Sequence, residues 1–344
     1  MFSLISAPRS LRIALGAAIL ATAVTPLVAA PVEARPANFA RSFNQVPSGD
    51  EQARRQAMPL LFVGDNANNQ ISVFAANSKT QSPKPLRVIS TGLEGPQGMT
   101  TDLAGNLYVA NLYGNTVTIY GPNQSVPKAT LSSNILSPVD VKVDGAGDVY
   151  VANSPGFGET SYILEFVAGQ SSPSSAWYLP SSNLTISGIT LLNPTSSPSI
   201  YASAYSSNPS GFATGGVFSC YPGNSNCVNV GPTLGQPGGI SVEQSPGGPS
   251  PFEYLAVDQY VPGVDVFEPG NSPNPVRQLV TGGTPEFLTL NKARTRLFVA
   301  DRFYGRVTLY SFATGKILNQ FYPAGGNDTT QVYGVAISPS GAYL

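Results

Sequence analysis

Hydrophobic and small residues alternate along this chain in short segments that are separated by turns. The clearest case is the stretch 105–121, in which Leu107–Asn111 and Thr116–Tyr120 both alternate at the period of a β-strand. Residues 112–115, between the two strands, have the composition of a turn. A second turn precedes the first strand, and Gly105 in it can take a positive φ. The stretch is therefore predicted to be one β-hairpin.

The hairpin recurs from residue 59 onward, and each copy is followed by a third, more polar segment and by a short strand rich in small residues. That short strand begins at a Pro-x-Gly-like corner. First strands are predicted at 60–65, 106–111, 148–153, 199–204, 253–258 and 296–301. Corners are predicted to begin at Pro96, Pro138, Ile186, Pro237, Pro285 and Val332.

Six units of four strands predict an all-β fold, a six-bladed β-propeller over residues 59–344. The first unit has three of its strands at the amino end, and residues 333–338 are predicted to supply its missing innermost strand. The ring would then be closed by a sheet that joins the two ends of the propeller. Small residues at the corners fit the crowding expected near a central axis.

Residues 1–34 have the layout of a secretory signal peptide, with Arg9 and Arg12 before an apolar run and small residues before a cleavage point. An uncleaved amino-terminal anchor is the alternative. Residues 35–58 are interpreted as a linker that contains a short helix beginning near Ser48. The protein is thus expected to be exported, to the periplasm or the extracellular space.

The two cysteines of the chain, Cys220 and Cys227, enclose a turn-like sequence that can bring them together. In an oxidising compartment this pattern predicts a disulfide bond. Two free thiols in a surface hairpin, or a metal site, are the alternatives.

Composition excludes some functions. The formal net charge is −1 and no basic run interleaves with aromatic residues, so nucleic-acid binding is not expected. The chain contains no histidine, which removes every mechanism that depends on a histidine base or ligand. No serine or cysteine has the sequence context of an activated nucleophile.

The order Pro-x-Gly, then Asp-x-x-Gly-Asn, then Leu-Tyr-Val-Ala-Asn, best seen in residues 96–120 and 138–153, resembles the NHL repeat and the broader TolB-like six-bladed propellers. That group also contains gluconolactonase and regucalcin-like enzymes and strictosidine-synthase-like proteins. The resemblance covers residues 59–344. In the calcium-dependent lactonases of the group, acidic or amide ligands project into the central channel, several of them from the second position of the corner.

The resemblance therefore directs attention to the second corner positions, which are Gln97, Val139, Ser187, Gly238, Glu286 and Tyr333, with Asp140 one place further. Glu286 matches a calcium ligand in type and place, Gln97 can add a carbonyl oxygen, and Asp140 can turn inward. Val139 and Gly238 offer no ligand where one is expected. A Ca²⁺ site formed by Glu286, Gln97 and Asp140 in a lactonase-like hydrolase is one hypothesis. In the other, Glu286 and Asp140 hydrogen-bond backbone amides at strand ends.

A polar residue ends the first strand in five of the six hairpins. These residues are Asp65, Asn111, Asn153, Asp258 and Asp301. Their repetition at a strand-to-turn junction favours a structural role as turn caps that bond the backbone two residues further on.

The long loops, at 154–161, 205–216 and 244–251, are rich in Ser, Gly and Pro. Adaptable loops on one face of a rigid ring form a recognition surface, although tolerated insertions would have the same composition. The leading hypothesis is an exported, monomeric, non-catalytic module that binds a protein, peptide or glycan through these loops.

Overall fold

The computed structural model describes residues 58–156, 158–192, 198–206, 214–221, 223–231, 233–244, 252–259, 262–267, 274–325 and 330–339. All of them belong to one compact unit, Ser48–Leu344. The predicted signal peptide and the predicted short helix lie outside the described residues. In the part of the chain that is described, no helix has the length and hydropathy of a membrane span.

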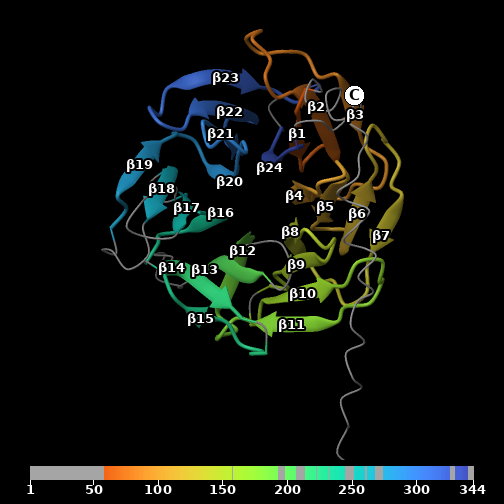
Figure 1. The fold of residues 1–344 in the computed structure, drawn as a ribbon, viewed down its shortest axis with the longest axis vertical. Helices are drawn as coiled ribbons and strands as arrows, with labels where there is room; N and C mark the ends of the chain where they lie inside the picture. Colours follow the sequence, from red (N-terminus) through yellow and green to blue (C-terminus); the bar gives the residue numbers. More distant parts are fainter. Residues whose placement is uncertain are drawn as a thin grey trace, which may run out of the picture. The chain divides into compact units, whose positions relative to one another are not determined.

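The described residues form 24 strands in six antiparallel four-stranded sheets, here called blades 1 to 6 (Figure 1). In order from the innermost strand outward, the first three blades are β24 (Val332–Ile337), β1 (Leu60–Asp65), β2 (Gln70–Ala75), β3 (Arg87–Ile89); β4 (Pro96–Thr101), β5 (Leu107–Asn111), β6 (Thr116–Tyr120), β7 (Ala129–Leu131); and β8 (Pro138–Val143), β9 (Val149–Asn153), β10 (Tyr162–Phe166), β11 (Ser175–Tyr178). The last three are β12 (Leu184–Leu192), β13 (Ser199–Ser206), β14 (Thr214–Cys220), β15 (Val228–Asn229); β16 (Pro237–Gln244), β17 (Phe252–Asp258), β18 (Gly263–Phe267), β19 (Arg277–Val280); and β20 (Pro285–Leu290), β21 (Arg296–Asp301), β22 (Arg306–Ser311), β23 (Ile317–Phe321).

The innermost strands β24, β4, β8, β12, β16 and β20 contact one another in this order and surround the axis of the ring (Figure 1). Strand β24 pairs antiparallel with β1, with Phe62 opposite Ala336 and Val63 opposite Val335. The predicted six-bladed fold is confirmed, and so is its closure by the carboxyl-terminal strand.

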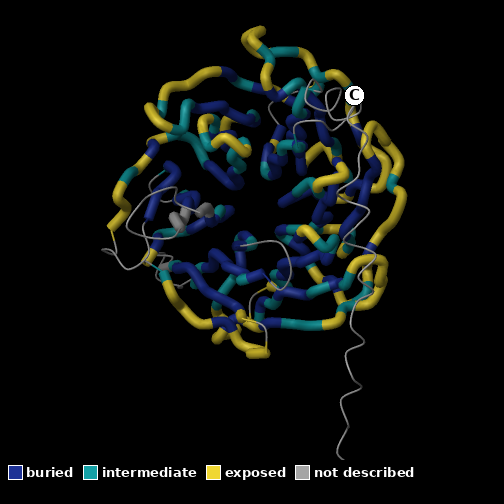
Figure 2. Tube along the Cα trace, in the orientation of Figure 1, coloured by how far each residue is buried: buried dark blue, intermediate teal, exposed yellow. Residues whose placement is uncertain are grey.

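The hydrophobic core lies between the blades. Each of six clusters of buried apolar side chains joins two adjacent blades; Phe74 of blade 1 and Phe321 of blade 6, for example, meet edge to face at 5.4 Å between ring centroids. Burial is greatest in the second strand of a blade and least in its outermost strand (Figure 2). The ring is held together because each blade covers the apolar face of the next.

A β-bulge occurs at every Pro-x-Gly-like corner. In blade 2, Pro96 pairs with Asn111 and the ladder resumes only at Met99, opposite Val109. Equivalent register shifts occur in the other blades. A bulge frees residues from the ladder and re-aims their side chains. The second corner position is thereby released from regular alternation in all six blades.

Two expectations about the loops are corrected. Strands β13 and β14 pair as far as Ser206 and Thr214, so the ends of the predicted loop 205–216 are strand. The segments 154–161 and 207–213 follow the second strand of a blade, whereas 245–251 follows an innermost strand. Because successive strands are antiparallel, the strand ends that these segments join lie on opposite faces, not on one.

The predicted disulfide bond is present between Cys220 and Cys227, which are both buried. Its loop packs against the outer strand of the neighbouring blade. The backbone N–H of Tyr178 donates to the carbonyl of Ser225 at 2.8 Å, and Trp177 Nε1 donates to the carbonyl of Tyr221 at 3.0 Å. The disulfide thus fixes a contact between blades 3 and 4.

Candidate functional site

The second corner positions of all six blades line one cavity of about 190 Å³, here called the central cavity. These residues are Gln97, Val139, Ser187, Gly238, Glu286 and Tyr333. The cavity lies where the innermost strands begin, on the face to which the second strands run and from which the third strands return. The six side-chain positions that the sequence resemblance indicated are therefore brought together.

A second set of lining residues was missed in the sequence. They are Ser154, Tyr205, Gln259 and Arg302. Each directly follows the end position of the first predicted strand of its hairpin, and in three cases that position is one of the repeated Asp or Asn residues. These lining residues could therefore have been identified from the sequence by reading the position directly after each repeated strand end.

Glu286 is the most buried charged group of the central cavity, with 9% of its side chain exposed. Its Oε2 accepts a hydrogen bond of 2.6 Å from Gln259 Nε2. Its Oε1 lies 3.1 Å from Arg302 Nε as an ion pair, yet it accepts no hydrogen bond from a described residue. Arg302 instead donates from Nη1 to Tyr333 Oη at 3.0 Å. One carboxylate oxygen is therefore balanced in charge but lacks a directed donor.

The surroundings of the central cavity raise the pKa values of three of its lining residues. Burial, which outweighs the attraction to Arg302 and the hydrogen bond from Gln259, raises the pKa of Glu286 to about 7. Burial also raises the pKa of Tyr205. The hydrogen bond to Tyr333 and the charge of Glu286 raise the pKa of Arg302, although burial opposes them. Glu286 thus changes charge near neutral pH while Arg302 stays cationic.

The raised pKa of Glu286 predicts a loss of stability as pH rises. The folded protein holds the Glu286 proton more tightly than the unfolded chain, whose pKa is near 4.5. This contribution is complete below pH 4.5 and is lost as pH rises through about 7. Compared with Glu286→Gln, the wild type is expected to lose about 2.5 kcal/mol of unfolding free energy between pH 5 and pH 8. Urea unfolding at stepped pH measures this difference.

The matched control for this prediction is Glu94→Gln, because Glu94 is an exposed carboxylate in the segment that leads to a corner of the same face. It should keep the pH profile of the wild type. If the unfolding free energies of the wild type and Glu286→Gln change in parallel with pH, the prediction is wrong.

The three residues of the predicted Ca²⁺ site do not all meet. Gln97 and Glu286 line the central cavity, whereas Asp140 is fully buried between blades 3 and 4 and does not line it. Both oxygens of Asp140 bond Lys142 Nζ at 2.7 Å, and Oδ1 and Oδ2 also accept the backbone N–H groups of Val141 and Ile189. The second hypothesis for Asp140, bonding to backbone amides, describes what is observed. The calcium site itself stays a prediction.

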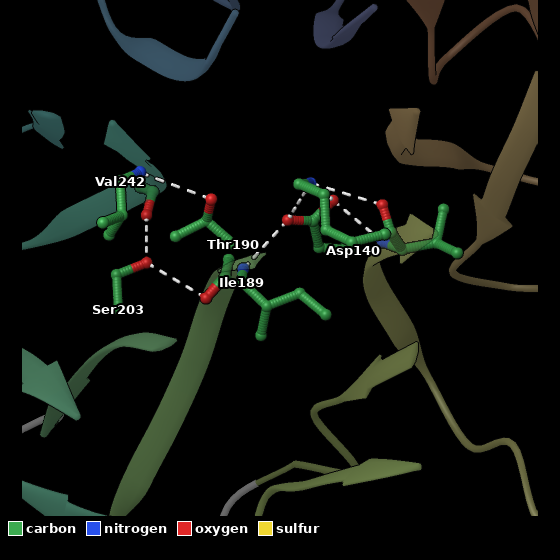
Figure 3. Close-up of polar contacts among 9 residues, drawn as sticks. Asp140, Ile189, Thr190, Ser203 and Val242 are labelled. Carbon is green, nitrogen blue, oxygen red and sulfur yellow. Dashed lines mark hydrogen bonds and ion pairs between the residues drawn. The ribbon is translucent and has the colours of Figure 1, made fainter. Parts of the chain in front are cut away.

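Figure 3 shows that Asp140 begins a set of polar contacts between neighbouring innermost strands. Asp140 reaches from β8 to the N–H of Ile189 on β12, at 2.9 Å. Thr190 Oγ1 on β12 accepts from the N–H of Val242 on β16, at 3.3 Å. Ser203 Oγ donates to the carbonyl of Gly238 on β16, at 2.6 Å. Because the backbones of adjacent blades do not pair there, side chains supply the hydrogen bonds between them.

The repeated residues at the strand ends are buried and bond mainly to the segment that precedes an innermost strand. Asn111 Oδ1 accepts from the N–H of Glu94, and Asn153 Oδ1 accepts from Leu136. Asp301 Oδ1 accepts from Thr284, and also from Tyr304 three residues on. Asp65 accepts from Gln331 and from Asn68 in the same way. Asp301 also accepts from the N–H of Phe303, so the predicted bond two residues on is made there alongside the bond to the incoming segment.

Exposed aromatic side chains lie on the same face as the central cavity, one in blade 2 and three in blade 6. They are Tyr113, Phe303, Tyr304 and Tyr322, which are 69, 73, 45 and 39% exposed. Tyr113 packs on Gly95, next to a corner, and Phe303 and Tyr304 follow Arg302 of the cavity. Arg306 stacks on the ring of Tyr304 at 4.5 Å and donates to Tyr322 Oη. We call these four residues the aromatic rim.

Comparison with known proteins supports the fold alone. No family model and no curated protein matches the sequence. Among solved structures, a nidogen/laminin complex contains a chain similar to this one, with a TM-score of 0.60, 16% identity, and coverage of 82% of this chain and 99% of that chain. A functionally unknown protein from Desulfotomaculum acetoxidans DSM 771 is similar with a TM-score of 0.55, 15% identity, and coverage of 81% and 99%. The resemblance to NHL repeats therefore stays a prediction.

Proposed function

We propose that this chain is a non-catalytic binding module that recognises a protein or peptide on the face that carries the central cavity and the aromatic rim. The observation that carries the proposal is the combination of four exposed aromatic side chains with a polar cavity on one face. Tyrosine, phenylalanine and arginine are enriched at protein interfaces, because they supply large contact areas together with hydrogen bonds.

Two further observations support binding. The structurally similar nidogen/laminin complex is, by its name, an assembly between proteins. In the central cavity of this chain, Glu286 is the single carboxylate among the described lining residues, and Arg302 lies against it. A calcium-dependent hydrolase needs several oxygen ligands, usually with two or more carboxylates. Binding is therefore the better account of this site.

Export remains part of the proposal. The disulfide bond between two buried cysteines is compatible with an oxidising compartment, and the amino-terminal pattern of residues 1–34 is that of a signal peptide. A protein that acts outside the cytoplasm would meet partners through such a face.

Selection of a displayed library of random peptides against the immobilised full chain tests the proposal. Recovered peptides are expected to bind at least about tenfold more weakly to the double variant Phe303→Ser/Tyr304→Ser, because aromatic anchors of this kind contribute about 1.4 kcal/mol or more. The matched control is Leu103→Ser/Val126→Ser. These two residues are 79 and 64% exposed and lie in connections of the opposite face.

Equal affinity for the rim variant and the wild type would refute the proposed face. So would a selection that recovers no peptide above the blank surface. Peptides that lose affinity for the Leu103→Ser/Val126→Ser control instead would move the binding site to the other face.

A further inference from the structure

Glu286 is an acceptor that is incompletely satisfied. Its Oε1 is buried and accepts no hydrogen bond from a described residue, although the Oε2 of the same carboxylate is bonded to Gln259. Arg302 contributes charge at 3.1 Å, but its Nη1 is committed to Tyr333. A buried carboxylate oxygen without a donor costs free energy, and a donor brought by a ligand would recover it. The cavity therefore favours a ligand that donates hydrogen bonds.

The central cavity has room for such a donor. Its volume of about 190 Å³ exceeds the roughly 10 to 15 Å³ of such volume that one water molecule requires. Gln97 also lines the cavity and its side-chain amide makes no hydrogen bond with the described residues, so that a further carbonyl acceptor is available. The ring of Tyr205 lines the cavity as well, and aromatic rings attract cations.

We propose that the central cavity receives a primary ammonium group of the partner, carried by a lysine side chain or by a peptide amino terminus, with Glu286 as its charged acceptor. This inference rests on the proposed function and names the group that the binding face would recognise. A charged donor forms a stronger hydrogen bond to a carboxylate than a neutral one. Arg302 opposes the ammonium charge, so the binding is expected to be weak and to need probes at millimolar concentration. A ligand carboxylate would be repelled by Glu286.

Four titratable groups face Glu286. Arg302 and Asp301 come from the end of β21, Tyr205 from β13 and Tyr333 from β24. Arg302 lowers the pKa of Glu286 and Asp301 raises it, while burial has the largest effect and places it at about 7. An ammonium ion binds the ionised carboxylate, so its binding releases the proton of Glu286. Affinity should therefore rise about tenfold between pH 6 and pH 8.

The test uses defined probes with the full chain. Nα-acetyl-lysine-N-methylamide carries a side-chain ammonium, and glycyl-glycinamide carries an amino-terminal one. Their matched controls are the same molecules with the amine acetylated. Binding is measured by NMR titration at millimolar concentration against the wild type, Glu286→Gln and the control Glu94→Gln, at pH 6, 7, 8 and 9.

At least one free amine is expected to bind the wild type and Glu94→Gln. Its affinity should fall at least about tenfold in Glu286→Gln and on acetylation. The two sources differ in pH profile: a lysine ammonium stays charged to pH 9, whereas an amino-terminal amine loses its proton above about pH 8 and its binding declines again.

Equal binding of acetylated and free probes would overturn the inference in favour of a neutral ligand. Binding that does not depend on Glu286 would also overturn it. Ca²⁺ could instead raise the unfolding temperature of the wild type but not of Glu286→Gln, and displace the bound amines. That result would assign the cavity to a metal ion. If no amine binds while displayed peptides still bind through the aromatic rim, the ammonium inference fails and the proposed function stands.

Discussion

Removal of residues 331–344 is expected to abolish the folded propeller at ordinary temperature. The deletion takes away β24, which pairs with β1 and contacts the innermost strands β4 and β20 on either side. Val332 and Val335 are at most 3% exposed, and each contributes about 1.5 to 3 kcal/mol when fully buried. With the lost backbone hydrogen bonds the expected cost exceeds about 5 kcal/mol, which is comparable to the whole stability of many domains.

Circular dichroism and thermal unfolding measure this effect. The truncated chain should lose its cooperative transition and expose the open edge of β1 to aggregation. A synthetic peptide of residues 331–344 is the control, because its addition in trans should restore the transition in proportion to its concentration. If the truncated chain has the same thermal midpoint as the wild type, the pairing of β24 with β1 does not stabilise the propeller.

Asp140→Ala is expected to destabilise the protein by about 3 kcal/mol or more. The substitution leaves the buried N–H of Ile189 without its acceptor and Lys142 without its ion pair. Breaking a buried ion pair from one side costs about 3 to 5 kcal/mol, and the partial exposure of Lys142 places this case near the lower limit. A shift of the thermal midpoint by about 6 to 12 °C would follow.

Two variants separate the parts of this effect. Asp140→Asn keeps an acceptor oxygen for Ile189 and should cost less than Asp140→Ala. Lys142→Gln removes the cation and leaves the two backbone bonds of Asp140 in place. If Asp140→Ala has the same thermal midpoint as the wild type, the contact between β8 and β12 does not stabilise the ring. A large stabilisation of the wild type by Ca²⁺ that Asp140→Ala abolishes would restore Asp140 as a metal ligand.

Most of the fold was predictable because the blade is repeated in the sequence. Strand β1 and strand β21 have the predicted bounds, and the turn at Gly105 has the expected positive φ of 82°. The outer strands β15 and β19 were not located. Strand β15 is two residues long, and an exposed outer strand needs no hydrophobic period that a pattern could show.

The candidate site was predicted in part. The second corner positions were identified because the corner repeats, and all six line the central cavity. Arg302 and Gln259 were not identified, since each stands one residue beyond a repeat and belongs to a different blade. Asp140 was placed in the site by its nearness to a corner in sequence. The bulge at that corner turns consecutive residues in different directions, which sequence spacing does not reveal.

The sequence by itself determined the blade, the number of blades, the closing strand and the pairing of Cys220 with Cys227, because these depend on local alternation, turn chemistry and repetition. The tertiary structure alone decided which side chains meet at the axis. Glu286 and Arg302 come from blade 6 and Tyr333 from blade 1, so the three side chains meet only when the ring closes. Their contact sets the burial that raises the pKa of Glu286, and the proposed recognition of an ammonium group depends on it.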